Sequence, residues 1–387
     1  MGDGARVGLN PDRPDQTMTR RSAIFFSSLL TALLLTVLPG CERMDRPASE
    51  ENAILFRAGM IGGSSVSTKG TVDNAYPSHE SDFIKAGNTI SVYGSWTSPT
   101  GTTTDIFRGV ELTCEETADV LEPFQWTYAP LRYWRSEGTY NFGSVYPTNA
   151  RVEYGTSGGK LVATYSMLAD DYDLMVASTK RNMDEIGSTA SVPLVFHHAC
   201  AAVRFLFRKA EGSETDYFID SFELQNLSAV GRLVANWVVT NNPQPGDEEY
   251  QISWTPAEAK SSGIYAWQAA SQADWIEVPE NYAVHPETPE EIEKWHFVIP
   301  QQLLGDGITH PTLRFSIHVG NDATPVYTRL QLPEEQEDPN TNNLVPIRWE
   351  PGKLYTYKVQ IQPSKAFIEV EVKPWDEYYL GVDDIAF

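Results

Sequence analysis

Strict alternation of apolar and polar residues is the feature that most limits how this chain can fold. Leu313–Val319 alternates without a break, and Tyr355–Ile361 and Ile368–Pro374 do the same. Val203–Phe207 and Ile90–Trp96 follow the same period of two. Residues two apart point to the same face of a strand, so each segment has one apolar and one polar face. Because such strands are typical of antiparallel β-sandwiches, the sequence predicts an all-β fold.

Turn-rich stretches separate these segments, as expected for a sandwich built from many short strands. The chain has 387 residues, which is enough for more than one domain. A polar, Gly-containing stretch at Asn182–Ser191 lies between two strand-like regions. We therefore expect one β-sandwich over residues 53–190 and a second over residues 191–387.

The N-terminus has the pattern of an export signal. Arg20 and Arg21 precede an apolar run, Ala23–Leu38, and Leu38-Pro-Gly-Cys41 follows. This run is short for a spanning helix, which needs about 20 apolar residues. Its ending resembles a lipobox, so residues 1–40 are expected to be removed and Cys41 to carry acyl chains. A plain secretory signal is the alternative.

Two details follow from this assignment. Residues 41–52 then form a short tether between the lipid and the first domain. Everything before Met18 is polar and unlike a signal, so Met18 is a candidate for the true start. The processed chain is expected at the outer membrane, facing the cell surface.

The charge balance excludes one class of function. The formal net charge is −23, and no basic stripe stands out along the chain. A nucleic-acid-binding protein needs such a stripe to displace counterions from phosphates, so no nucleic-acid partner is expected. The acidity instead indicates a soluble, self-repelling surface.

The two cysteines after Cys41 do not form a disulfide framework. Cys114 and Cys200 are far apart in the sequence, and the chain has no others. Export permits a bridge between them, but two buried thiols are the simpler expectation.

No motif in the sequence supports catalysis or metal binding. Gly155–Leu161 resembles a phosphate loop, but the glycine spacing is wrong and Leu161 stands where a Ser or Thr is needed, so a hairpin turn is expected. His197 and His198 point to opposite faces of a strand, and His198 with Cys200 gives only two ligands. We expect no catalytic residue, metal or cofactor.

Aromatic side chains crowd into Phe124–Trp134. Exposed rings of this kind could stack on sugars, and a monomeric, glycan-binding surface lipoprotein is the alternative function that they suggest. Large aromatic residues more often fill the core, which is the expectation we adopt.

Several segments, in order, resemble the fimbrillin family, the lipoproteins that build type V pili. They are Phe124–Trp134, Tyr140–Pro147, Asp173–Ala177, Pro193–Phe205, Phe297–Leu303, Trp349–Tyr357 and Val372–Asp376. The resemblance implies two tandem transthyretin-like (Greek-key) β-sandwiches in a fimbrium that supports adhesion. It also implies that an arginine-specific protease removes the first strand of the N-terminal domain. A donor strand from a neighbouring subunit then fills the groove.

Ala53–Arg57 fits the removable strand, because it is apolar and ends in an arginine. Burying its two or three large side chains contributes about 4–9 kcal/mol at ~1.5–3 kcal/mol each. We expect cleavage after Arg57; an arginine that merely faces solvent is the alternative.

The donor strand is expected near the C-terminus. Ala366–Trp375 contains a strand pattern, but Ile368–Val372 is better explained as the last core strand of its own domain. The tail is therefore the stronger candidate, through Tyr379, Leu380, Val382, Ile385 and Phe387. The partners would be other fimbrial subunits, with the stalk, tip or anchor role left open.

Overall fold

The computed structural model describes residues 52–60, 83–119, 123–155, 160–183, 191–238, 249–282, 293–303, 309–337, 343–363 and 365–374. All of them belong to one unit, Pro47–Phe387. Strands dominate these residues, with a short 3₁₀ turn at Gln272–Asp274, and the all-β prediction is confirmed. In this part of the chain, no helix has the length and apolar character needed to cross a membrane.

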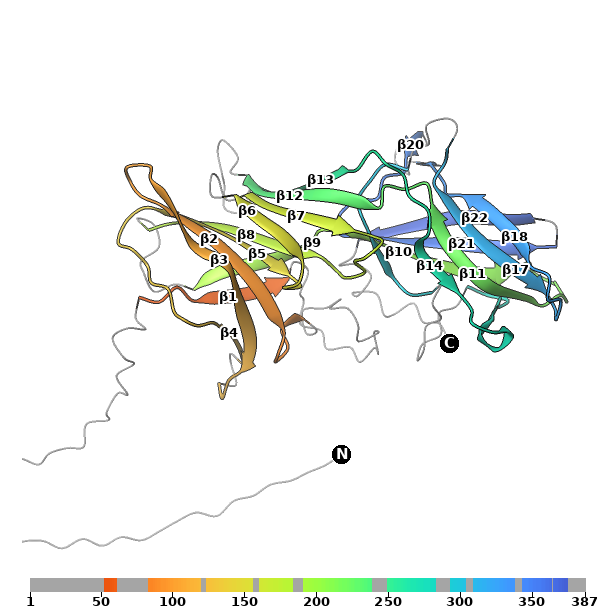
Figure 1. Ribbon diagram of the computed structural model, residues 1–387, viewed down its shortest axis with the longest axis horizontal. Coiled ribbons are helices and arrows are strands. Elements are labelled where there is room, and N and C mark those ends of the chain that lie inside the picture. Colours follow the sequence, from red (N-terminus) through yellow and green to blue (C-terminus); the bar gives the residue numbers. More distant parts are fainter. Residues whose placement is uncertain are drawn as a thin grey trace, which may run out of the picture. The chain divides into compact units, whose positions relative to one another are not determined.

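The first part of the described chain closes into a barrel of strands in the order β1-β4-β3-β2-β5-β8-β9 (Figure 1). Neighbouring strands are antiparallel except β1 and β9, which run parallel. The bounds are β1 Phe56–Met60, β2 Thr89–Thr97, β3 Thr103–Glu116, β4 Phe124–Thr127, β5 Thr139–Tyr146, β8 Met175–Asn182 and β9 Val192–His198.

Aromatic and branched side chains fill this barrel. Its buried cluster contains Ile54, Phe56, Phe83, Ile90, Val92, Phe107, Leu112, Trp126, Tyr140, Phe142, Leu194 and Phe196. Ile90 and Val92 are fully buried on β2, as their alternation predicts. The barrel therefore has its own core, to which the segment before β1 already contributes.

A second sheet has the order β13-β12-β7-β6. Its strands are β6 Arg151–Gly155, β7 Lys160–Ser166, β12 Val230–Val238 and β13 Glu249–Pro256. Gly155 pairs with Lys160, so β6 and β7 form the hairpin expected in place of a phosphate loop. The indole N–H of Trp254 donates to the Ala199 carbonyl at 2.7 Å, which ties β13 to the chain just after β9.

Strand pairing crosses the boundary expected at 190/191. β9 follows that point in sequence, yet it pairs with β1 and β8 in the barrel. β12 also follows it and pairs with β7. Sequence alternation assigns a face to each strand but no neighbour, so these non-local pairings were not predictable from it.

The remaining strands form two facing sheets. One is β16-β10-β21-β22 and the other is β14-β11-β17-β18, with β15 on β11. The bounds are β10 Ala201–Lys209, β11 Tyr217–Gln225, β14 Ile264–Gln268, β15 Ile276–Glu277, β16 His296–Val298, β17 Thr312–Val319, β18 Val326–Gln331, β21 Lys353–Gln362 and β22 Lys365–Pro374. A separate short ladder pairs β19 Glu335–Glu337 with β20 Leu344–Pro346.

Aromatic contacts hold these two sheets together as a sandwich. The rings of Phe207 and Phe315 meet edge to face at 5.2 Å across the core. Phe205 and Tyr357, which pair across β10 and β21 within one sheet, stack at 5.2 Å. The alternating segments of β10, β17, β21 and β22 all form strands, which confirms the sequence pattern. β22 pairs with β21 over its whole length at the edge of its sheet, so Ile368–Val372 is a strand of its own domain.

Candidate functional site: the first strand and its groove

The N-terminal segment Ala53–Ala58 is a structural part of the barrel. Ile54 is 0% exposed and Phe56 is 4% exposed, whereas Leu55 between them is 43% exposed. Ala58 is also buried, and the Arg57 side chain is exposed. The segment predicted to be apolar is therefore largely buried, with the large side chains at positions 54 and 56 turned inward and Leu55 turned outward.

An aromatic pocket receives Phe56. Its ring lies 5.3 Å from Phe107, 5.5 Å from Phe142 and 5.9 Å from Tyr128, each at a steep interplanar angle. Edge-to-face pairs of this kind contribute about 0.5–1.5 kcal/mol each beyond their burial. Phe56 is thus the main anchor of the segment.

Tyr128 clamps the backbone next to that anchor. Its hydroxyl donates to the Ile54 carbonyl at 2.7 Å and accepts a hydrogen bond from the Arg132 amide at 3.1 Å. The Ile54 amide in turn donates to the Arg132 carbonyl at 2.8 Å. Burial raises the pKa of the Tyr128 hydroxyl, so it stays protonated and able to donate at neutral pH.

The two edges of β1 are held unequally. Along one edge β1 pairs in parallel with β9, from Phe56 opposite Val192 to Met60 opposite Phe196. Along the other it pairs with β4 at Phe56 opposite Trp126. β1 is thus the point at which an otherwise antiparallel barrel closes. Its removal would expose the backbone edge of β9 and the apolar groove in front of it.

Arg57 lies inside β1 rather than after it. The strand continues to Met60, and Arg57 stands opposite Pro193 of β9. The backbone carbonyl of Leu55, two residues before Arg57, accepts a hydrogen bond from the Val192 amide at 2.7 Å. A cut after Arg57 would release the part of the segment that carries Ile54 and Phe56 and leave Ala58–Met60 beside β9.

Other predicted site residues fall outside the part of the chain that the structure describes. These are the lipidation candidate Cys41 and the donor candidates Tyr379, Leu380, Val382, Ile385 and Phe387. The last described strand, β22, ends at Pro374, one residue before the undescribed tail.

The aromatic crowd at Phe124–Trp134 belongs to the core, as expected. Trp126 is buried in the barrel, and Trp134 packs edge to face on Tyr140 at 4.7 Å. Most of the aromatic side chains of this segment therefore pack on the barrel core, while Tyr133 is 46% exposed.

The histidines and cysteines do not assemble a reactive centre. His198 Nδ1 lies 2.8 Å from a carboxylate oxygen of Asp173, and both side chains are buried. Burial lowers the pKa of His197 to about 4, so it is neutral at pH 7. Cys114 and Cys200 are buried, unbridged thiols, and burial raises the pKa of each. Among the described residues no group of three or more His, Cys, Asp or Glu side chains could hold a metal ion.

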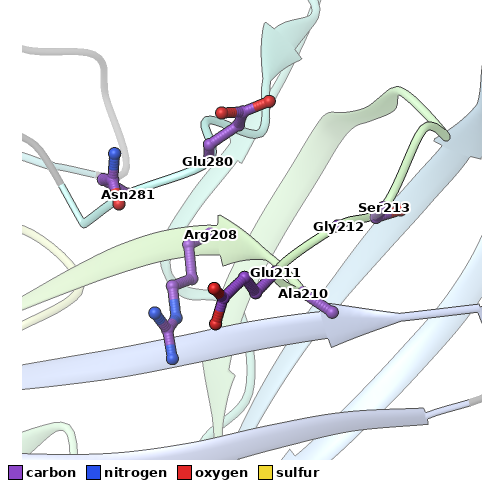
Figure 2. A pocket seen from close by; sticks show the side chains of 7 residues that line it. All are labelled: Arg208, Ala210, Glu211, Gly212, Ser213, Glu280 and Asn281. Carbon is purple, nitrogen blue, oxygen red and sulfur yellow. The ribbon is translucent and has the colours of Figure 1, made fainter.

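A polar cavity of about 450 Å³ lies where β10 turns toward β11. Figure 2 shows Arg208 and Glu211 projecting from this end of β10 and its turn, with Glu280 and Asn281 contributed by another segment. The guanidinium of Arg208 lies over the Tyr282 ring, 4.7 Å from its centre. The side chains that line the cavity include no paired nucleophile and base, so it does not resemble an active site.

Sequence reasoning missed three features of the site: the parallel partner β9, the Tyr128 clamp and the Asp173–His198 pair. The spacing of the residues involved along the sequence does not predict any of these three contacts. The order of the segments Phe124–Trp134, Asp173–Ala177 and Pro193–Phe205 was the available clue, since all three line or flank the groove.

Comparison with known proteins supports the family suggested by those segments. The sequence matches the family described as fimbrillin-like over residues 71–375. A search of curated protein sequences gives no match.

Solved structures that match this chain include a fimbrial protein from Bacteroides vulgatus, with 12% sequence identity and a TM-score of 0.48. That match covers 84% of this chain and 99% of the other. A candidate cell adhesion protein from Bacteroides uniformis has 14% identity and a TM-score of 0.45, and the match covers 85% of this chain and 100% of the other. The tip fimbrial protein Mfa3 from Porphyromonas gingivalis has 11% identity and a TM-score of 0.35, with 76% and 96% covered. Because the family match spans far more than half of the sequence, this chain belongs to the fimbrillin-like family.

Proposed function

We propose that this chain is a non-enzymatic structural subunit of a cell-surface pilus, assembled by exchange of its first strand for a strand of a neighbouring subunit. The observation that carries the proposal is the burial of Ile54 and Phe56 in a barrel that β1 closes. The segment released by a cut after Arg57 is held by these two side chains, by the Tyr128 hydrogen bond and by a short stretch of pairing with β9, so it can leave and be replaced by another strand.

The energetics fit an exchange mechanism. Full burial of Ile54 and Phe56 contributes about 3–6 kcal/mol at ~1.5–3 kcal/mol each. A whole domain has a net stability of about 5–15 kcal/mol. A barrel without this segment would keep only a small margin of stability until a second strand filled the groove. A head-to-tail contact of this kind does not close on itself, so it extends into a fibre.

The other parts of the proposal follow the same scheme. Signal removal before Cys41 and acylation of its thiol would anchor the precursor at the outer membrane. An arginine-specific protease would cut after Arg57, and the tail with Tyr379, Leu380, Val382, Ile385 and Phe387 would serve as the donor. We further propose that the two halves are tandem transthyretin-like sandwiches, with β9 and the β12–β13 hairpin assigned to the N-terminal one.

The position of Arg57 adds a condition to processing. A protease binds its substrate as an extended strand, and the backbone around Arg57 is paired with β9 in the closed barrel. Cleavage therefore requires β1 to separate first. The short pairing with β4 marks the edge from which opening starts.

Treatment of the purified full chain with an arginine-specific protease, followed by N-terminal sequencing and native gels, tests this proposal. We expect a new N-terminus at Ala58 together with a ladder of oligomers. Arg57→Gln should abolish both the cut and the ladder. Arg108→Gln, at a side chain 80% exposed on β3, is the matched control and should change neither. A ladder from uncut protein, or a cut without oligomers, would rule out exchange of this strand.

A further inference from the structure

The outer face of the sheet β14-β11-β17-β18 contains a second feature, a groove of about 280 Å³. In Figure 1 these strands are the green to blue ones of the C-terminal sandwich. The groove is lined by Ser221, Phe222, Glu223, Ala266, Trp267, Gln268, Arg314 and Tyr327. Its volume is just below the ~300–1,000 Å³ of typical small-molecule sites, so it has room for one sugar-sized ring.

Two aromatic side chains that are not fully buried line this groove. Tyr327 on β18 is 64% exposed, and Trp267 on the edge strand β14 is half-buried. The inner side of Trp267 lies against Phe222, 6.1 Å between ring centres. The exposed Tyr327 ring is therefore the aromatic surface that the groove offers to a ligand.

A neutralised ion pair forms the polar part of the groove. Arg314 Nη1 lies 2.8 Å from Glu223 Oε1, and the Gln225 side-chain amide donates to the same oxygen at 2.6 Å. Within the described residues this leaves Glu223 Oε2 and the remaining guanidinium N–H groups of Arg314 for a ligand. Arg314 also lies over one face of Tyr327, 5.2 Å from the ring centre, which orients both side chains.

Strand register places Tyr327 and the polar groups of the groove on one face of the sheet, whereas Trp267 lies opposite the buried Phe222 on the other. Glu223 lies opposite Arg314 across β11 and β17, and Ser316 lies opposite Tyr327 across β17 and β18. Ser221 lies opposite Gln268 in the same way. Directly opposed residues share a face of the sheet, so the groove is built on paired strands rather than on loops.

We propose that this groove binds a neutral carbohydrate. A sugar ring presents an apolar C–H face that packs on an aromatic side chain, and its hydroxyl groups both donate and accept hydrogen bonds. The groove offers the exposed Tyr327 ring for the first and a carboxylate, a guanidinium and an amide for the second. The Arg314–Glu223 ion pair has no net charge, and the formal net charge of the chain is −23. An acidic glycan would therefore be repelled.

The polar cavity of Figure 2 is larger but lacks this combination. The Arg208 guanidinium lies over the nearby Tyr282 ring, 4.7 Å from its centre, and the Lys358 ammonium lies 6.0 Å from it. The residues that line that cavity include charged side chains and no aromatic one. Variants of that cavity therefore serve as controls.

The test is native gel electrophoresis of the uncut full chain in gels that contain dextran, mannan, galactomannan or laminarin, with heparin and hyaluronan as acidic probes. We expect retardation by at least one neutral polysaccharide and by neither acidic one. Tyr327→Ala and Arg314→Gln should weaken the apparent affinity by about tenfold or more, as expected for the loss of one aromatic contact or one charged hydrogen-bond donor. Val326→Ala, the neighbouring residue at 57% exposure, and Asn281→Ala in the cavity of Figure 2 should leave binding unchanged.

No retardation by any of the four neutral polysaccharides would overturn this inference, as would equal binding by Tyr327→Ala and wild type or binding of the acidic probes alone. Uncut protein is used throughout, so a failure here says nothing about strand exchange. Equally, a protein that forms no oligomers after cleavage could still bind sugar.

Discussion

Replacing Phe56 by Ala removes the main anchor of the first strand while leaving its backbone pairing with β9 in place. The matched change is Leu55→Ala, one residue away on the same segment. Phe56 is 4% exposed and touches three aromatic rings, whereas Leu55 is 43% exposed. The two variants therefore differ in which face of one strand loses its side chain.

The magnitude follows from burial. A buried Phe→Ala change costs about 3–5 kcal/mol, since the lost transfer free energy and the remaining cavity both count. Leu55→Ala removes a half-exposed side chain and should cost less than about 1 kcal/mol. With a slope of ~3 kcal/mol per molar urea for a chain of this size, Phe56→Ala should lower the barrel's unfolding midpoint by about 1 M or more.

Urea denaturation measures the midpoint, and hydrogen exchange locates the effect. The Val192 amide, which donates to Leu55, should exchange much faster in Phe56→Ala than in Leu55→Ala. Equal midpoints and equal Val192 exchange in the two variants would show that β1 contributes nothing to closing the barrel. The account of a removable but stabilising strand would then be wrong.

Three further changes test the packing behind the groove. Burial lowers the pKa of His197 from 6.5 to about 4, so the free energy of unfolding is highest above pH 6.5 and falls as the pH drops toward 4. Urea titrations at pH 7 and pH 4.5 measure this fall. Because the side chain is partly exposed, we expect the fall to be about 1–2 kcal/mol smaller in His197→Gln than in the wild type. Asp173→Ala removes the carboxylate that lies against the buried His198 and should cost about 1–3 kcal/mol in the same assay at pH 7. Gly94→Ala places a Cβ 2.8 Å from a ring carbon of Phe142 and should lower the free energy of unfolding by about 1–3 kcal/mol. An unchanged urea midpoint would mean that the Phe142 side chain can move aside without loss of stability.

Local features of the fold were predictable because they depend on neighbours in sequence. The period of two at Leu313–Val319 and Tyr355–Ile361 predicts strands, and both segments form them. In Leu313–Val319 the polar residues Ser316 and His318 are buried as well, and Val319 is 45% exposed. The inward direction of Ile54 and Phe56 does not follow from this rule, because Leu55 between them is also apolar. The hairpin at Gly155–Lys160 was predictable from its turn residues, which outweighed the resemblance to a phosphate loop.

Partner choice was not predictable, because it depends on contacts between residues far apart in the chain. Nothing in Ala53–Arg57 indicates that it will run parallel to β9, more than a hundred residues later in the sequence. The hydrogen bond from Tyr128 to Ile54 and the pairing of Asp173 with His198 arise only once the barrel has closed. The family resemblance supplied the idea of a replaceable strand, which the residue pattern alone does not contain.

The central claim is that a second molecule can take the place of Ala53–Arg57, and a mixing experiment tests it most directly. The acceptor is protein cut after Arg57 and lacking the tail from Asp376 to Phe387; the donor is uncut protein with the tail intact. Size-exclusion chromatography coupled to light scattering should show a one-to-one heterodimer for this pair and none when the acceptor keeps its first strand. A heterodimer that forms equally well with the uncut acceptor, or none with the cut one, would contradict the account.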